Sequence, residues 1–149
     1  MAANIQPIFT LTPNKGNATD GNPGTRLTTA NTTRDLSSTT NADLLFTSGT
    51  NGSRVDIITF THEAASQAQA SVAAVGRVFL TTTATGSNPK LIAEIALPLI
   101  TPSAVIIGQS AVITFTPALV LKTGQFLWVS ISATQTSGGY DIVASGGDY

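Results

Sequence analysis

The most constraining feature of this sequence is a regular succession of short segments rich in Val, Ile, Thr and Phe, each closed by a turn of Gly, Asn or Pro. β-Branched and aromatic segments at short, even spacing predict strands, and the turns between them suit antiparallel pairs. We expect strands over 43–47, 54–63, 71–83, 90–97, 110–116, 125–134 and 140–144. The sequence therefore predicts an all-β fold, an antiparallel β-sandwich that is either jelly-roll-like or immunoglobulin-like.

Segment 125–134 is apolar on both faces, because side chains alternate along a strand. One face carries Leu127, Val129 and Ile131. The other carries Phe126 and Trp128 with two serines. A strand of this kind is covered twice, by the opposite sheet on one side and by a loop or another subunit on the other. We therefore expect a homo-oligomer.

Segment 90–97 has the same double character. Its alternation predicts one face made of Leu91, Ala93, Ile95 and Leu97. The opposite face is made of Ile92, Glu94 and Ala96. Both strands thus point to a fold with more than one apolar layer.

The first 41 residues differ from the rest of the chain. Residues 5–12 predict an edge strand or extended arm, because Pro7 lacks a backbone donor. Residues 14–41 are dense in Asn, Gly and Thr, which is typical of a long loop. We divide the chain into an N-terminal arm with a long polar loop, residues 1–41, and a sandwich domain, residues 42–149. The alanine-rich segment 62–74 is the one candidate for a helical turn or two.

Composition excludes several partner classes. Only 10% of the 149 residues are charged, and 7 Lys and Arg against 8 Asp and Glu leave a net charge of −1. No basic stripe is available for nucleic acid and no polybasic cluster for an anionic membrane, so neither is expected as a partner. The chain has 0 Cys, which excludes thiol nucleophiles and thiolate metal sites. The first nine residues carry no secretory-signal pattern.

The one long uncharged run, from Ile95 to Leu121, is long enough to span a bilayer. Four residues that break a helix interrupt it: Pro98, Pro102, Gly108 and Pro117. We therefore expect strands and loops here and no transmembrane segment.

An enzyme active site is hard to assemble from these residues. His62, followed by Glu63, is the single histidine, and no G-x-S-x-G turn supplies a serine nucleophile. The Asp residues are scattered singly, and a calcium ion shared by Asp141 and Asp148 is the one metal alternative left open. We expect no catalytic residue, no metal site and no cofactor, and a binding or assembly role instead.

Five stretches form a set. They are LLFT with Gly49 and NGSRV, then GRVFL, LIAEIALP, LVL with Gly124 and LWVS, and the closing GGDY. From Leu44 onward this pattern of strands and turns resembles small virion proteins of tailed bacteriophages. The resemblance implies a decoration or cement protein on the capsid exterior, commonly trimeric, that binds the major capsid protein and its own copies.

We place the capsid or subunit interface on apolar residues of the arm and of segment 125–134: Ile5, Ile8, Phe9, Leu11, Phe126 and Trp128. Two alternatives remain open. One is an adaptor of the phage tail, baseplate or fibre. The other is a carbohydrate-binding module, in which Trp128 and Tyr140 form a sugar platform.

Overall fold

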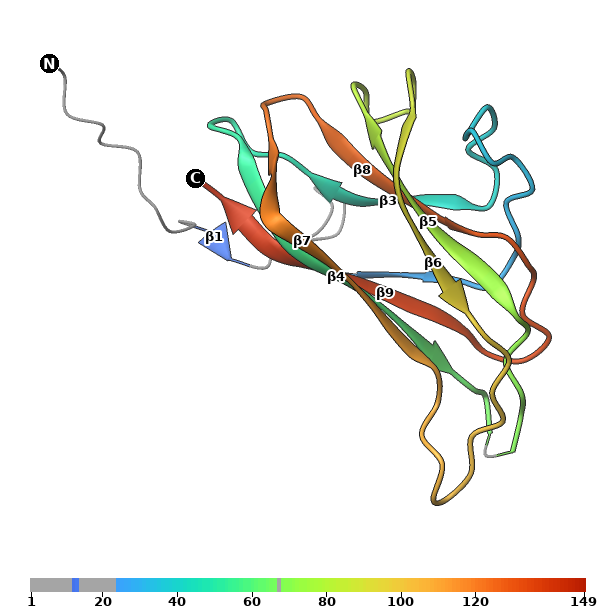
Figure 1. Cartoon of the computed structure of the whole chain (residues 1–149). Helices are drawn as coiled ribbons and strands as arrows, with labels where there is room; N and C mark the ends of the chain where they lie inside the picture. Colours follow the sequence, from blue (N-terminus) through green and yellow to red (C-terminus); the bar gives the residue numbers. More distant parts are fainter. Residues whose placement is uncertain (1–11, 14–23, 67) are drawn as a thin grey trace, which may run out of the picture.

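The computed structural model describes residues 12–13, 24–66 and 68–149 (Figure 1). Within these residues the chain forms strands and no helix. The strands are β1 (Thr12–Pro13), β2 (Gly24–Leu27), β3 (Ala42–Thr47), β4 (Ser53–Glu63), β5 (Ala74–Thr81), β6 (Lys90–Leu97), β7 (Ser110–Leu121), β8 (Phe126–Ile131) and β9 (Gly139–Asp148). The predicted all-β class is confirmed.

Two antiparallel sheets pack face to face. Sheet A has the order β1–β9–β4–β7, and β2 also pairs with β9; sheet B has the order β3–β8–β5–β6. The pairs are nested, because β2 pairs with β9, β3 with β8, β4 with β7 and β5 with β6, alternately in sheet A and sheet B. A long hairpin rolled up in this way is a jelly roll. The strand order thus decides between the two topologies that the sequence leaves open.

The main core lies between the sheets. Leu127, Val129 and Ile131 are fully buried in it, as the alternation of β8 predicts. Phe60 and Tyr140 bring large side chains from sheet A. Phe126 and Trp128 belong to a separate cluster on the other face of β8. The prediction that β8 is apolar on both faces is confirmed.

The uniform alternation expected for β6 is wrong at its start. Val78 pairs with Ala93, but the next residue, Phe79, pairs with Leu91, so Ile92 is an extra residue in a β-bulge. The bulge reverses the faces: Ile92 packs against the core and Leu91 is 40% exposed.

The helical candidate 62–74 is also wrong, because no described residue of this segment is helical. The backbone of its second half is bonded to other loops instead. Ser71 donates its N–H to Ile100 O at 2.9 Å, and the side chain of Gln135 bonds both the N–H and the C=O of Val72, at 2.7 and 3.2 Å. These long-range bonds override the helical preference of the alanines.

Strand β2 was not expected, because its four residues lie inside the polar stretch. It pairs with β9 from Val143 to Tyr140. A Cβ on Gly24 would lie 2.8 Å from Ile142 O, so glycine permits this close approach. Leu27 reaches the core at the other end of the strand. Residues 24–27 are therefore an integral part of the sandwich.

Candidate interaction surface

The outer face of sheet B carries a second apolar cluster, covered by the chain itself. Its buried members are Leu36, Ala42, Phe79 and Trp128, with Leu44 and Phe126 partly buried against them. Leu36 comes from the loop 28–41 between β2 and β3. It is 2% exposed, and Trp128 is 9% exposed. The second cover expected for β8 is supplied at Trp128 by a loop of the same chain.

Loop 28–41 is held in a specific conformation. The buried Asn31 donates through Nδ2 to the carbonyl oxygens of Ser38 and Thr40, both at 2.7 Å. Its Oδ1 accepts from the N–H of Thr33 at 3.0 Å. Leu36 itself has φ 55°, a left-handed conformation that is uncommon for leucine. Asn31 and the cluster under Leu36 together fix the loop on the sheet.

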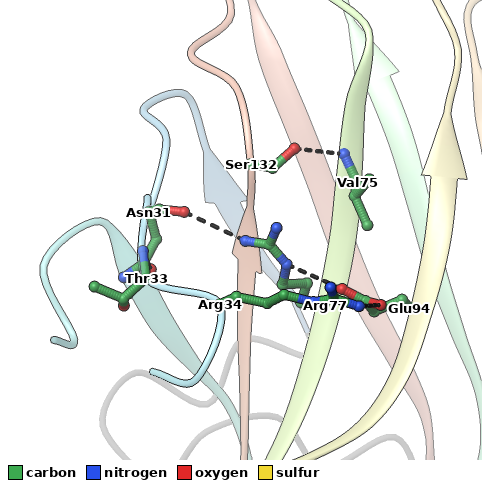
Figure 2. Close-up of polar contacts among 7 residues, drawn as sticks. All are labelled: Asn31, Thr33, Arg34, Val75, Arg77, Glu94 and Ser132. Carbon is green, nitrogen blue, oxygen red and sulfur yellow. Dashed lines mark hydrogen bonds and ion pairs between the residues drawn. The ribbon is translucent and has the colours of Figure 1, made fainter. Parts of the chain in front are cut away.

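A charged network ties the same loop to sheet B (Figure 2). Glu94 of β6 accepts from Arg34 of the loop at 2.8 Å and from Arg77 of β5 at 3.2 Å. Arg77 also donates to Asn31 O at 3.5 Å. The hydrogen bond from Arg34, with a further one from Arg77, holds the pKa of Glu94 below its usual value of 4.5. Glu94 thus joins loop 28–41 to both β5 and β6 through Arg34 and Arg77.

The interface residues predicted from the sequence separate into two groups. Trp128 and Phe126 lie together in the cluster under Leu36. Ile5, Ile8, Phe9 and Leu11 lie outside the described residues. The structure therefore brings only the first two together.

His62 is buried beside Tyr140 at the end of β4. Its ring meets the Tyr140 ring edge-on, with centroids 5.3 Å apart, and its Nε2 lies 3.2 Å from Ser137 O. Because a carbonyl accepts, Nε2 carries the proton in this contact. Burial raises the pKa of Tyr140. Both rings are packing elements of the sandwich, and neither offers an exposed aromatic platform.

The two aspartates considered for calcium lie near opposite ends of β9. Asp148 accepts from Ser53 Oγ at 2.6 Å, and Asp141 pairs with Arg26 at 3.2 Å. Arg26 also contacts Glu63. Burial first, then a hydrogen bond with Glu63, raises the pKa of Asp141. Among the described residues, no three His, Asp or Glu side chains gather in a group that could hold a metal.

The outer face of sheet A differs from that of sheet B. In the described chain, neither apolar cluster contains a loop residue that covers this face. One row across it consists of Val143, Thr59 and Val112 in neighbouring strands. Six of the eight large hydrophobic side chains that are exposed in the described residues belong to β7 or to the loop 98–109 before it: Leu99, Val105, Ile106, Ile107, Val112 and Val120. We call these six residues the β7 surface.

The loop part of the β7 surface is a built structure. Ser103 and Ile106 exchange two backbone hydrogen bonds, at 2.9 and 3.3 Å, and Ser103 Oγ accepts from the N–H of Val105 at 3.3 Å. Val105, within this tight turn, is 91% exposed, and Ile107, directly after it, is 83% exposed. The loop projects from one end of the sandwich (Figure 1). Apolar side chains are thus presented to solvent by a structured turn.

The β7 surface is not predicted from the sequence as an interaction site. Its signal was the uncharged run from Ile95 to Leu121, which was weighed only as a membrane span. Among the described residues, no helix is long and apolar enough to cross a membrane.

Comparison of the chain with protein-family models, with curated proteins and with solved structures finds no match in any of the three.

Proposed function

We propose that this protein is a structural component of a bacteriophage virion, a cement protein on the capsid exterior that binds the major capsid protein and its own copies. The resemblance of the strands from Leu44 onward to small phage virion proteins suggests this role. Jelly rolls are common in viral capsid proteins and also in lectins, so the fold is compatible with the role without determining it.

The observation that carries the proposal is the β7 surface. Large apolar side chains that are exposed close together mark sites of protein association, and four of the six, Leu99, Val105, Ile106 and Ile107, belong to one loop. Here Val105 and Ile107 are held almost fully exposed at the tip of a fixed turn. The run from Ile95 to Leu121 contains no charged residue, so burying it desolvates no charge.

Many weak contacts of this kind suit a cement protein. Each copy that binds the assembled shell and not its dissociated subunits stabilises the shell by mass action. A modest area per copy is sufficient, because the number of copies is large. Catalysis is not needed for this role.

The carbohydrate-binding alternative has less support. A sugar platform needs exposed aromatic faces. Trp128 is covered by Leu36, and Tyr140 is fully buried in the core. Neither of the two aromatic side chains on which that alternative depends is therefore exposed in the described structure.

The test is the copy number in purified virions, measured by quantitative protein staining against the major capsid protein. We expect about one copy per capsid subunit, the stoichiometry of a repeating shell contact. A few copies per hundred capsid subunits would assign the protein to the tail, baseplate or fibre. Its absence from virions would contradict a virion role altogether.

A further inference from the structure

The first eleven residues share one property with the β7 surface: neither contains a charged side chain. Residues 1–11 lie outside the described residues, and after Met1 four of them are large and apolar: Ile5, Ile8, Phe9 and Leu11. Burying these four without leaving an unpaired charge requires an uncharged apolar partner surface. The β7 surface is such a partner.

The register of β1 limits what this segment can pair with in its own sheet. Thr12 lies opposite Asp148, the last residue of β9. The next residue, Tyr149, donates its N–H to Gly52 O at 3.2 Å, on the side of β4. The pairing described between β1 and β9 thus begins at the row of Thr12 and Asp148.

Distance separates this segment from the tip of the β7 surface in its own copy. Thr12 lies in the same row of sheet A as Ser53, whereas Ser110 lies in the row of Thr61 at the other end. Eight residues along β4 and three strand spacings across the sheet give a diagonal of about 30 Å. Ile5 precedes Thr12 by seven residues and reaches at most about 25 Å from it. None of the four apolar residues can therefore reach the projecting loop of its own copy.

The edge of β7 offers a place for an additional strand. Strand β7 pairs only with β4, so its other edge has no strand partner in the described residues. Strand β1 has only two residues, and the other edge strands carry charges that discourage pairing: Arg26 in β2, Asp43 in β3, and Lys90 and Glu94 in β6. Strand β7 carries none, and a bulge at 115–118 leaves 110–114 as the regular part of its free edge.

We propose that residues 1–11 of one copy bind a second copy, where residues 5–11 add a strand to the free edge of β7 at 110–114 and bury the neighbouring loop tip. This inference deepens the self-association part of the proposed function and rests on it. An added strand gains main-chain hydrogen bonds along the edge and pockets for alternate side chains. Pro7 fits this role, because an outermost strand needs donors on one side only.

The contact joins two different surfaces, the arm of one copy and the β7 surface of the next. Such a heterologous contact passes from copy to copy and closes into a ring when the rotation permits. This arrangement is compatible with a trimer, in which each copy gives one arm and receives one.

The test is cross-linking between single-cysteine variants of the full chain, which has 0 Cys of its own. Ile8→Cys carrying a larger tag is mixed with untagged Val112→Cys and treated with a short bismaleimide. We expect a product of one tagged and one untagged chain. The matched control replaces Val112→Cys with Leu91→Cys, since Leu91 is exposed to a similar degree, 40% against 49%, but lies on sheet B. We expect at least a tenfold lower yield with the control.

A second variant tests the chemistry of the contact. Adding Ile107→Lys to the Val112→Cys chain places a charge on the loop tip, and we expect the yield to fall at least fivefold. Equal yields with Leu91→Cys would overturn the proposal, as would a link formed only when both cysteines are in one chain. An unchanged yield with Ile107→Lys would also overturn it.

Failure of this contact and failure of the proposed virion role give different results. If the wild-type protein is present at high copy number in virions but the cysteine variants form no Ile8–Val112 cross-link, the proposed contact of residues 1–11 is overturned and the virion role is not. A link that forms between copies of a protein absent from virions would overturn the virion role and leave the arm contact in place.

Discussion

The two sheets of this sandwich bury their inner faces in the same way, but their outer faces differ. On sheet B, loop 28–41 covers Trp128 with Leu36 and is fixed by the network of Arg34, Arg77 and Glu94. On sheet A, Val112 is 49% exposed, and the ion pairs described there, Arg26 with Asp141 and Arg54 with Asp56, join residues of the sheet's own strands. One outer face is completed within the chain, and the other is left for association.

The difference shows how to separate packing from interaction in a chain of this composition. An apolar outer face accompanied by buried polar partners, as at Asn31, contributes to the stability of one copy. An apolar outer face without them contributes little to folding, because its side chains stay in water. Substitutions on the two faces should therefore have very different effects on unfolding.

The largest expected effect is that of Trp128→Ala. Removing a large side chain from the covered face costs about 3–5 kcal/mol of unfolding free energy. Val112→Ala, on the open face, is expected to change it by no more than about 0.5 kcal/mol. Urea denaturation followed by far-UV circular dichroism measures both. Similar losses for the two variants would mean that the open face is also packed within one copy.

Leu36→Ala is expected to come next. Loss of a buried leucine costs about 2–4 kcal/mol, and partial detachment of loop 28–41 should expose the indole of Trp128. The measurements are urea unfolding and Trp128 emission, which should shift to longer wavelength. Leu91→Ala, at an exposed leucine, is the control and should change neither. A stable variant with unshifted emission would show that Leu36 is not what covers Trp128.

The pH dependence of stability should reveal the network on the covered face. Because the pKa of Glu94 is lowered from 4.5 in the folded state, its contribution to stability is present above that pH and is lost as the pH falls through the folded value. We expect wild type to lose more unfolding free energy on acidification from pH 6 to pH 3 than Glu94→Gln. Arg34→Met should remove most of the difference, since Arg34 is the main cause. Parallel pH profiles for wild type and Glu94→Gln would contradict this.

The smallest effect, of opposite sign, is expected at Asp141 on sheet A. Its pKa is raised from 3.8, so the folded state favours the protonated form and this contribution weakens stability as the pH rises through the folded value. Relative to Asp141→Asn, wild type should therefore lose stability between acidic and neutral pH. Glu63→Gln should reduce the effect, because the hydrogen bond with Glu63 is one of its causes. If wild type instead gained stability relative to Asp141→Asn as the pH rises, the raised pKa of Asp141 would be refuted.

Much of the local structure was predictable from the sequence. Strand β6, predicted at 90–97, strand β8, predicted at 125–134 and found at 126–131, and the two-faced character of β8 follow from alternation and turn residues, which act over a few positions. The bulge at Ile92 was not predictable, because it depends on the register against β5. The helical candidate at 62–74 failed for the same kind of reason: its backbone partners, near Ile100 and Gln135, are distant in the sequence.

The candidate surface was only half predictable. The sequence indicated that a loop or a subunit would cover the outer face of β8, but not which of the two. It contained the uncharged run from Ile95 to Leu121, but the run alone does not reveal that Val105 and Ile107 stay in water while Leu121 is buried. Exposure depends on what packs above a residue, and that is set by strands far away along the chain.

Propensity, alternation and charge are local properties, and from them the sequence predicts an all-β chain of short, turn-linked strands, an uncharged segment 1–11 and one long uncharged run. Only the assembled fold sets the nested strand order of the jelly roll, the folding of loop 28–41 over Trp128, and the exposure of the β7 surface. Each of these depends on contacts between residues distant in sequence, whose free energy is gained only when the sheets are assembled.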